Sequence, residues 1–237
     1  MNLDGKTAVV TGGAKRVGSI IAQTLAEAGC NIVIHHNKSD PSGTCEKMNQ
    51  FGVECTSIRA DLRNPEDYAK FDTLKKVDIL VNSASVFHRD NFYNVTLEDW
   101  NKSLEVNLTA PFLMMKRIVP LMKGDDALVV NMVDGAGLRP WVNYLAHGVS
   151  KAALIHLTEI TARTLAPKIR VNAVVPGPVL KTEGMDNAVW ERVYGKTSLK
   201  RPGDPLHIAS AVKFLAENDY ITGEVLRVDG GEYLENR

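Results

Sequence analysis

The sequence predicts a single α/β domain in which helices cover both faces of a doubly wound parallel sheet. Short runs of β-branched and apolar residues alternate with longer amphipathic segments along the 237 residues. Apolar runs without polar alternation suit strands that are buried on both faces, as in parallel sheets covered by helices. Repeated strand–helix–strand units favour right-handed crossovers within one sheet. Because no linker, low-complexity segment or internal repeat interrupts this pattern, we expect one domain over residues 1–237.

The individual elements follow from periodicity and from helix-capping residues. Between the first two expected strands, apolar residues recur at helical spacing over 17–25, and a glycine follows as a stop signal. Thr96 and Asp99 form a capping pair that should open a long helix through about residue 122. A second long helix is expected over about 142–165. The apolar runs that mark strands are 8–10, 32–34, 79–81, 128–130, 171–175 and 225–226.

Composition and charge argue against several classes of function. The 28 basic residues balance 28 acidic ones, so no strong field favours nucleic acid or an anionic membrane. The longest apolar runs are strand-sized, which predicts no transmembrane helix, and residues 1–6 leave no room for a signal peptide. Cys30, Cys45 and Cys55 are odd in number and match no metal or redox spacing. We therefore expect free thiols in a cytoplasmic protein without a metal site.

A glycine-rich turn joins the first expected strand to the first expected helix. Its residues are Thr11, Gly12, Gly13, Ala14, Lys15, Arg16, Val17 and Gly18. The pyrophosphate of a dinucleotide needs this close backbone approach and the positive end of a helix. The G-x-G-x-x-G spacing fails here, and glycine-rich turns also occur without a ligand. The turn therefore needs support from elsewhere in the chain.

The end of the second expected strand favours NADP(H) over NAD(H). An NAD site usually presents an acid about 20 residues beyond the glycines, where it holds the ribose hydroxyls. Here the stretch reads His35-His36-Asn37-Lys38-Ser39, and the first acid is Asp40. A carboxylate would repel a 2′-phosphate, whereas Lys38, the Ser39 hydroxyl and Lys15 or Arg16 would hold it. These cations could also be solvated surface residues, but they coincide with the glycine-rich turn.

With these motifs, the chain resembles the short-chain dehydrogenase/reductase family along nearly its whole length. The family's T-G-x-x-x-G-x-G pattern fits the glycine-rich turn, except that Arg16 stands where the middle glycine belongs. Further matches, in chain order, are Asp61-Leu62, Asn82-Ser83-Ala84-Ser85, Asn107, Pro176-Gly177 and Val228-Asp229-Gly230-Gly231. The resemblance implies a Rossmann-type fold that binds NADP. The expected cofactor residues are Gly12, Lys15, Arg16, Val17, Gly18, His36, Asn37, Lys38, Ser39, Asp61, Leu62, Asn82, Ser83, Ala84, Lys151, Pro176 and Gly177.

Within that family the chain is most similar to the pteridine reductases, which reduce biopterin- or folate-type rings with NADPH. The similarity lies in Lys15-Arg16, Lys38-Ser39, Phe87, Asn131-Met132-Val133-Asp134 and Ala188-Val189-Trp190-Glu191. Most short-chain dehydrogenases place the catalytic serine where Asp134 stands, whereas pteridine reductases have aspartate. The resemblance implies a substrate flap over about 178–204, and it implies that Phe87 stacks on the substrate ring. From the residue alone, an ordinary core role for Phe87 is equally open.

One family residue is replaced, namely the tyrosine of the Y-x-x-x-K motif. This chain reads His147-Gly148-Val149-Ser150-Lys151, so His147 and Lys151 would share one helix face. Lys151 can then still hold the nicotinamide ribose while the proton donor changes. Three interpretations stay open: Asp134 and His147 act as an acid pair, Tyr144 supplies a phenol from one turn further away, or the chemistry is lost.

We therefore expect an NADPH-dependent reductase of a pterin-like or related small cyclic substrate. The expected catalytic residues are Asp134, His147, Lys151 and Asn107, and the expected substrate contacts are Phe87, Tyr144 and Trp190. One alternative is a generic ketone or 3-oxoacyl reductase, against which the aspartate in place of serine argues. The other is a catalytically silent NADP(H)-binding protein.

The resemblance also implies a homo-oligomer. Family members commonly form dimers or tetramers through the two long helices, and we expect the same of this chain. In a tetramer, the tail ending Asn236-Arg237 could approach a neighbour's cleft.

Overall fold

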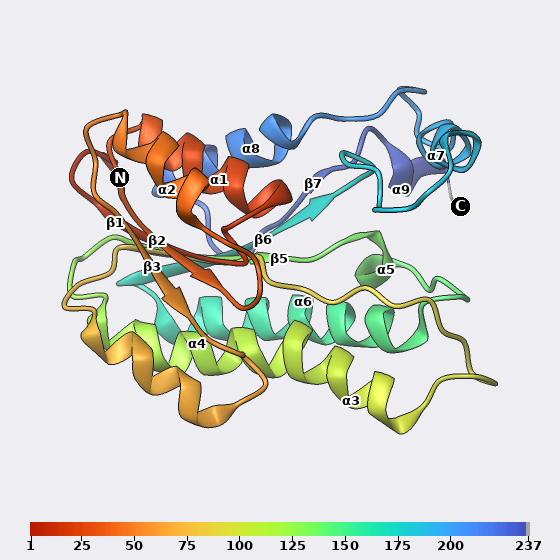
Figure 1. Ribbon diagram of the computed structural model, residues 1–237, viewed down its shortest axis with the longest axis horizontal. Coiled ribbons are helices and arrows are strands. Elements are labelled where there is room, and N and C mark those ends of the chain that lie inside the picture. The colour runs from red at the N-terminus through yellow and green to blue at the C-terminus, as the bar shows by residue number, and fades with distance from the viewer. Residues whose placement is uncertain (236–237) are drawn as a thin grey trace.

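Within residues 1–235, which the computed structural model describes, seven parallel strands form one sheet between two layers of helices (Figure 1). The strand order is β3-β2-β1-β4-β5-β6-β7, so the winding reverses between β1 and β4. This confirms the doubly wound α/β fold class. The strands are β1 (Thr7–Thr11), β2 (Asn31–His36), β3 (Cys55–Arg59), β4 (Ile79–Asn82), β5 (Ala127–Met132), β6 (Ile169–Pro176) and β7 (Val225–Val228).

Six of these strands coincide with the expected apolar runs. β3 does not, because it lies at the edge of the sheet and its residues are half-buried or exposed. The predicted tail contact of Asn236-Arg237 lies outside the described residues.

The helices lie in two layers, one on each face of the sheet (Figure 1). One layer holds α1 (Arg16–Glu27), α2 (Ser42–Asn49) and α8 (Pro205–Glu217); the other holds α3 (Leu97–Leu104), α4 (Ala110–Ile118) and α6 (Leu145–Leu165). Each layer buries an apolar stripe against the strands, for example Leu25 on one side and Met114 on the other. Burying such a side chain contributes about 1.5–3 kcal/mol. The sheet is thereby a rigid base for the loops at its carboxyl edge.

The remaining elements are short and lie between these layers or at the carboxyl edge. A 3₁₀ helix covers Pro65–Thr73, and α5 (Gly135–Leu138), α7 (Asn187–Tyr194) and α9 (Glu232–Glu235) follow later in the chain. In the region expected to be the flap, α7 is the one helix among the described residues. No described helix is long and apolar enough to cross a membrane.

The first expected long helix is present, but it is not uniform. The Thr96 hydroxyl accepts from the Asp99 N–H at 3.1 Å and caps α3 as expected. A π-helical turn (Glu105–Thr109) then joins α3 to α4, and a 3₁₀ turn (Val119–Leu121) ends the helix. The π-turn carries Asn107. Such turns within α-helices are frequent at functional sites.

The second long helix begins three residues later than expected. The Tyr144 N–H donates to the Trp141 carbonyl at 3.0 Å, so residues 141–144 form a turn. α6 starts at Leu145, and Tyr144 is its N-cap residue with φ −149° and ψ 51°. Tyr144 therefore precedes the helix rather than sharing its face with His147 and Lys151, which corrects that expectation.

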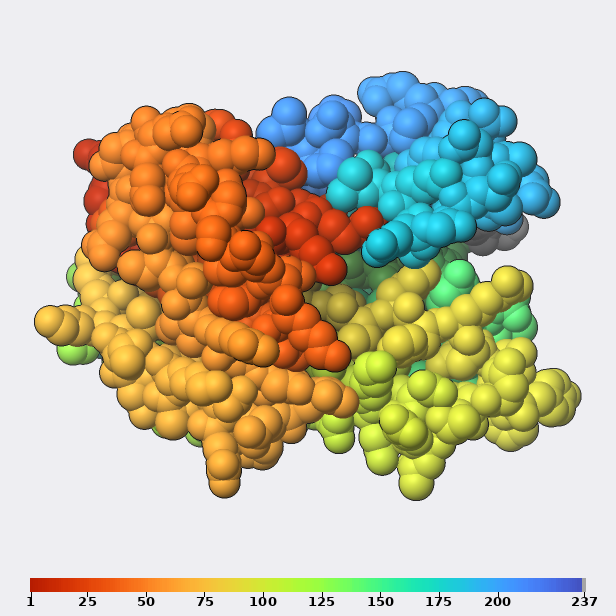
Figure 2. All heavy atoms as spheres, in the orientation of Figure 1, coloured from red at the N-terminus to blue at the C-terminus, as the bar shows by residue number. Residues whose placement is uncertain are grey.

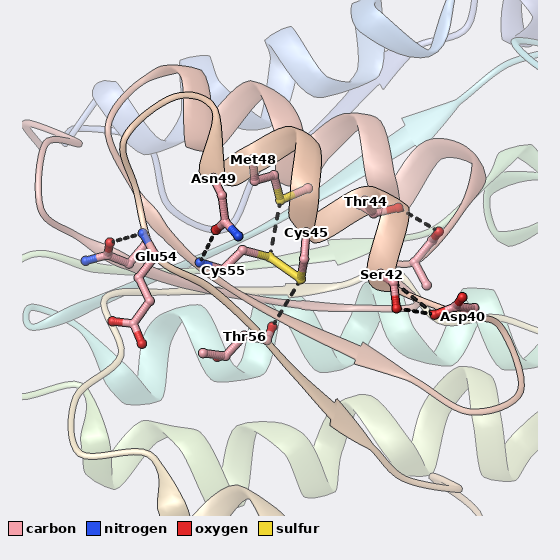
Figure 3. The surroundings of a disulfide bond; sticks show 11 residues. Asp40, Ser42, Thr44, Cys45, Met48, Asn49, Glu54, Cys55 and Thr56 are labelled. Atoms are coloured by element: carbon pink, nitrogen blue, oxygen red, sulfur yellow. Dashed lines mark hydrogen bonds between the residues drawn. A yellow bond between two sulfur atoms is a disulfide. The ribbon is translucent and has the colours of Figure 1, made fainter.

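Two of the three cysteines form a disulfide, which corrects the expectation of free thiols (Figure 3). Cys45 lies on α2 and Cys55 on β3, and their Cα atoms are 5.3 Å apart. Parallel pairing of β2 with β3 requires a crossover, and α2 returns over β3 as part of it. The spacing matches no disulfide motif, so only the packing brings the two residues together. Cys30 stays a buried thiol, and burial raises its pKa to about 12.

Candidate active site

A cavity of about 740 Å³ opens at the carboxyl ends of β1, β2 and β3. In the space-filling view the surface is hollowed beside this region, between the red N-terminal segment, the yellow-green residues and the cyan flap (Figure 2). Most of the expected cofactor residues line the cavity. They are Gly12, Lys15, Arg16, Val17, Gly18, His36, Asn37, Lys38, Ser39, Asp61, Leu62, Ser83 and Ala84.

The glycine-rich turn needs its glycines for space. A Cβ on Gly12 would lie 3.0 Å from the Ala84 Cα, and one on Gly18 would lie 2.4 Å from the Gly12 carbonyl oxygen. Arg16, in place of the family's middle glycine, has φ 55°, a left-handed conformation that glycine adopts without strain. The Arg16 guanidinium donates to the Lys181 carbonyl at 3.2 Å and ties the turn to the flap. Arg16, in its left-handed conformation, thus connects the glycine-rich turn to the flap.

Positive charge gathers at the β2 end of the cavity, where Lys15, Arg16 and Lys38 lie as expected. Arg63 and Lys102 also line it and were not predicted, because neither lies in a recognisable motif. Asp40, the first acid after β2, accepts from the Ser42 N–H at 3.0 Å, just before α2. The end of β2 therefore presents cations without the carboxylate that an NAD site uses.

His35 stabilises the glycine-rich turn from beneath. Its Nδ1 accepts from the Gly12 N–H at 3.3 Å, and its Nε2 lies 3.1 Å from the Ala60 carbonyl, to which it donates in this tautomer. Burial lowers the pKa of His35 to about 4, so the ring is neutral near pH 7. The two hydrogen bonds fix both the turn and the tautomer.

Four expected cofactor residues lie elsewhere, and one of them, the buried Lys151, belongs to the catalytic cluster described below. Asn82 is buried and donates to the Asn131 side chain at 2.9 Å, so it supports the strand ends rather than lining the cavity. Pro176 ends β6, and Gly177 lines a second cavity of about 540 Å³ between the flap and β7. A Cβ on Gly177 would lie 2.6 Å from the Asp229 Cα, which explains the glycine there as a close approach of two backbones.

The four expected catalytic residues form one cluster. Asp134 Oδ1 accepts from the Ala136 N–H at 3.0 Å and caps α5, and Oδ2 contacts His147 Nε2 directly. His147 Nδ1 lies 3.0 Å from the Val86 carbonyl and 3.3 Å from Asn107 Nδ2. Asn107 also fixes the loop after β4, since its Oδ1 accepts from the Val86 N–H at 2.9 Å.

Asp134 is the most exposed member of this cluster. Its side chain is 21% exposed, whereas that of His147 is 1% exposed. Both ring nitrogens of His147 already have partners, so a proton on Nε2 can leave the ring only toward the Asp134 carboxylate.

The charges of this cluster stabilise one another. Burial by itself would raise the pKa of Asp134, but the hydrogen bond and charge of His147 and the charge of Lys151 outweigh it and hold that pKa below its usual range. Burial lowers the pKa of Lys151, and Asp134 opposes that effect. The Lys151 ammonium donates to the Met132 carbonyl at 2.8 Å. Asp134 is thus ionised at rest.

An aromatic wall lies next to the acid pair. Phe87 is 44% exposed, stacks on Tyr144 with ring centroids 4.5 Å apart, and meets His147 edge-on at 4.7 Å. Trp141 packs edge-on against Tyr144 at 5.8 Å. Trp190 lies on α7 in the flap, where it packs against Tyr194 at 5.8 Å. Phe87 and Tyr144 form one wall, and Trp190 belongs to a separate aromatic pair.

Comparisons with known proteins agree over nearly the whole chain. The model of a family described as Enoyl-(Acyl carrier protein) reductase matches residues 12–232. A 3-oxoacyl-[acyl-carrier-protein] reductase of Vibrio cholerae is 32% identical over 99% of this chain and 100% of that protein.

Two solved structures illustrate the structural likeness. The angucycline C-6 ketoreductase LanV with bound NADP has a TM-score of 0.93 at 28% identity, covering 98% of this chain and 97% of that one. FolM alternative dihydrofolate reductase 1 from Brucella canis, complexed with NADP, has a TM-score of 0.92 at 30% identity, covering 98% and 96%.

Proposed function

The chain belongs to the short-chain dehydrogenase/reductase family, and we propose that it is an NADPH-dependent reductase of a planar, pterin-like cyclic substrate. Its relatives are NADP-dependent oxidoreductases, and this chain is an oxidoreductase of the same kind. The observation that carries the finer assignment is the partly exposed Asp134 carboxylate beside the exposed Phe87 ring. An aspartate in place of the usual serine suits a substrate that must be protonated at a ring position.

The cavity fits NADP(H). The turn at Gly12 and Gly18 leaves room that a side chain would fill, so a pyrophosphate can approach the backbone and the start of α1. Lys38, Ser39 and Arg16 supply donors for a 2′-phosphate. The bound nicotinamide supplies a hydride, and the protein supplies the proton and the geometry.

His147 and Asp134 would deliver that proton together. His147 holds a proton on Nε2, next to the Asp134 carboxylate, and Asp134 presents its carboxyl group to the ring bound at Phe87. The Nε2 proton would move to the Asp134 carboxylate and from there to the substrate ring, while Nδ1 keeps the proton that it donates to the Val86 carbonyl, so that a neutral imidazole is left. Water at the partly exposed Asp134 carboxylate would then replace the proton. The charge of Lys151 stabilises the ionised form of Asp134 and helps to lower its pKa. A positioned acid of this kind contributes about 10²–10⁴-fold to the rate.

The pterin-like ring is supported by the wall and by one structural relative. Phe87 and Tyr144 are stacked and nearly parallel at 18°, which leaves a flat apolar surface for a heteroaromatic ring. The Brucella canis relative is a dihydrofolate reductase by its description. A second candidate function is 3-oxoacyl reduction, which the 32% identity to the Vibrio cholerae protein favours. The third, an inactive NADP(H)-binding protein, rests on the replacement of tyrosine by His147.

The test follows NADPH oxidation with dihydrobiopterin, dihydrofolate and a simple ketone, with the wild type beside His147→Tyr. If the wild type turns over a pterin and His147→Tyr gains little, the acid pair is competent and the proposal stands. If the ketone is the only substrate, the 3-oxoacyl type of reaction replaces it. If only His147→Tyr is active while both proteins bind NADPH, the natural chain is a binding protein.

We also propose a homo-oligomer that uses the outer faces of α4 and α6. Phe112 on α4 and Val149 and Ile160 on α6 are 42%, 42% and 50% exposed, which is a large apolar exposure for two helices of a monomer. Light scattering on the purified protein tests this. A monomer at working concentration would remove the proposal.

A further inference from the structure

Helix α2 lies next to the cofactor cavity and is held there by few contacts. It has eight residues, and Met48 is the one among them whose side chain is fully buried. Isolated helices this short are marginal in water, so α2 depends on its contacts with neighbouring elements. The helix begins at Ser42, three residues after Ser39, and Lys38 and Ser39 line the cavity. The positions of α2 and of these cavity residues are therefore linked through the chain.

The contacts of α2 run to the glycine-rich turn on one side and to β3 on the other. Thr44 Oγ1 donates to the Ala14 carbonyl at 3.1 Å, which joins α2 to the turn. The Cys45–Cys55 disulfide joins α2 to β3 (Figure 3). The Asn49 side chain also accepts from the Cys55 N–H at 3.2 Å. The disulfide is the covalent part of this attachment.

β3 in turn holds the segment that follows β2. Arg59, the last residue of β3, donates from Nε to the Asn37 carbonyl at 3.1 Å. Asn37, Lys38 and Ser39 all line the cavity. This segment is therefore attached to β3 at one end and continues into α2 at the other, and the disulfide fixes β3 and α2 relative to each other. Opening the disulfide removes a constraint on Lys38 and Ser39, which offer donors for a 2′-phosphate.

The disulfide lies where a thiol reagent can reach it. Both of its cysteines are half-buried, and exposed residues adjoin them in the chain, among them Glu46 and Thr56. Disulfides that are open to solvent are the ones that thiols reduce most readily. The third cysteine, Cys30, is fully buried, so it does not take part in the exchange. The Cys45–Cys55 bond can thus open and close while Cys30 stays a thiol.

We propose that Cys45–Cys55 is a reversible redox site and that its reduction by a dithiol weakens NADP(H) binding at the 2′-phosphate end of the cavity. A thiolate of the dithiol attacks one sulfur of the bond and releases the other as a thiolate, which leaves a mixed disulfide. The second thiol of the reagent then displaces the remaining protein sulfur and closes the disulfide of the reagent. Two electrons and two protons pass to the protein, which gains two thiols, and the dithiol is oxidised to a cyclic disulfide.

The size of the effect follows from the linkage between the two sites. This inference rests on the proposed position of NADP(H) in the cavity and is independent of the substrate. If reduction weakens NADP⁺ binding by some factor, bound NADP⁺ favours the disulfide by the same factor. We expect about fivefold to tenfold, at the lower end of such couplings, because the contacts of Thr44, Met48 and Asn49 remain after reduction. A tenfold coupling would shift the midpoint potential of the disulfide by about 30 mV.

The experiment measures the Kd of NADP⁺ and of NAD⁺ by calorimetry, on protein oxidised with glutathione disulfide or reduced with dithiothreitol. Thiol counts on the denatured protein should give Cys30 alone in the first case and all the cysteines in the second. Reduction should raise the Kd of NADP⁺ about fivefold to tenfold and that of NAD⁺, which lacks the 2′-phosphate, by less than about twofold. The double variant Cys45→Ser/Cys55→Ser should bind like the reduced wild type under both conditions. Cys30→Ala is the matched control and should respond like the wild type.

The outcomes separate this inference from the cofactor site on which it rests. Equal thiol counts under the two conditions would overturn the reversible redox site. Equal NADP⁺ affinities of the two forms, equal losses for NADP⁺ and NAD⁺, or a loss of circular dichroism on reduction would overturn a local link to the 2′-phosphate end, while the proposed cofactor site stands. If neither form binds NADP⁺, the proposed cofactor site fails and this inference fails with it.

Discussion

Asp134→Asn isolates the part of the acid pair that faces the substrate. Asparagine has the same shape and still accepts from the Ala136 N–H, so the cap of α5 is kept. What changes is the charge beside His147 and Lys151, and with it the ability to pass a proton to the cleft. The variant therefore removes proton transfer while leaving the geometry of the wall and the cavity in place.

The expected magnitude follows from the role of a positioned acid. Its loss lowers kcat by about 10²–10⁴-fold, which corresponds to about 2.7–5.5 kcal/mol of barrier. Removing one partner of a fully buried ion pair costs about 3–5 kcal/mol of stability. Asp134 is 21% exposed and asparagine keeps a hydrogen bond, so the expected loss of stability is smaller, about 1–3 kcal/mol. NADPH affinity should change little, because Asp134 does not line the 740 Å³ cavity.

The assay is steady-state NADPH oxidation with dihydrobiopterin, together with a fluorescence titration of NADPH and urea unfolding. Asp99→Asn is the control, since it changes an exposed carboxylate in the first turn of α3 in the same way. A kcat for Asp134→Asn within threefold of that of Asp99→Asn would refute the proton path. Tyr144 would then be the next candidate for the donor.

Three further outcomes are expected. Lys38→Glu should raise the KM for NADPH by about tenfold or more without raising the KM for NADH, because the loss of a charge-assisted hydrogen bond to the 2′-phosphate costs about 1.5–3 kcal/mol. Equal effects on the two cofactors would contradict a contact between Lys38 and the 2′-phosphate. Cys45→Ser should lower the free energy of unfolding in urea by about 3 kcal/mol under oxidising conditions, because the unfolded chain regains the entropy of the loop that the disulfide to Cys55 closes. In the presence of a reductant the loss should be much smaller. If the two conditions give the same loss, the disulfide is not formed. His35 has a pKa lowered to about 4, so the unfolded chain takes up its proton first and stability falls from about pH 6.5 toward pH 4, by up to about 3 kcal/mol. His35→Asn should show a shallower decline in acid-unfolding curves, and an identical slope would contradict this account.

The periodicity of apolar residues predicted the sheet well because its strands are buried on both faces. β3 lacks that signal, since it is an edge strand with one neighbouring strand and its residues are half-buried or exposed. The start of α6 was misplaced for a different reason. Residues 141–144 have a helix-compatible pattern, but they form the Trp141–Tyr144 turn, which places Tyr144 against Phe87, so the helix begins later. The local sequence pattern thus identifies the helices and strands, whereas contacts between residues far apart in the chain set where each of them begins and ends.

The cofactor cavity was also largely predictable, because most of its residues fall in a few short segments of the chain and their types follow from the chemistry of phosphates. The glycine-rich turn and the segment after β2 meet because β1 and β2 are neighbours in the sheet. Arg63 and Lys102 were missed because nothing local distinguishes them from surface cations. Cys45 and Cys55 were missed for the same reason, since only the path of α2 over β3 brings them together.

The replacement of tyrosine by His147 could not be interpreted from sequence because its meaning depends on burial. A phenol at that position would carry its own proton into the cleft. An imidazole is shorter, and here it is 1% exposed with both nitrogens engaged, so it cannot touch a substrate itself. Under the proposed function, Asp134 would restore the path, because its carboxylate contacts Nε2 and its side chain is partly exposed. On that proposal His147 and Asp134 are one functional change rather than two, and the loss of the tyrosine does not require the loss of catalysis.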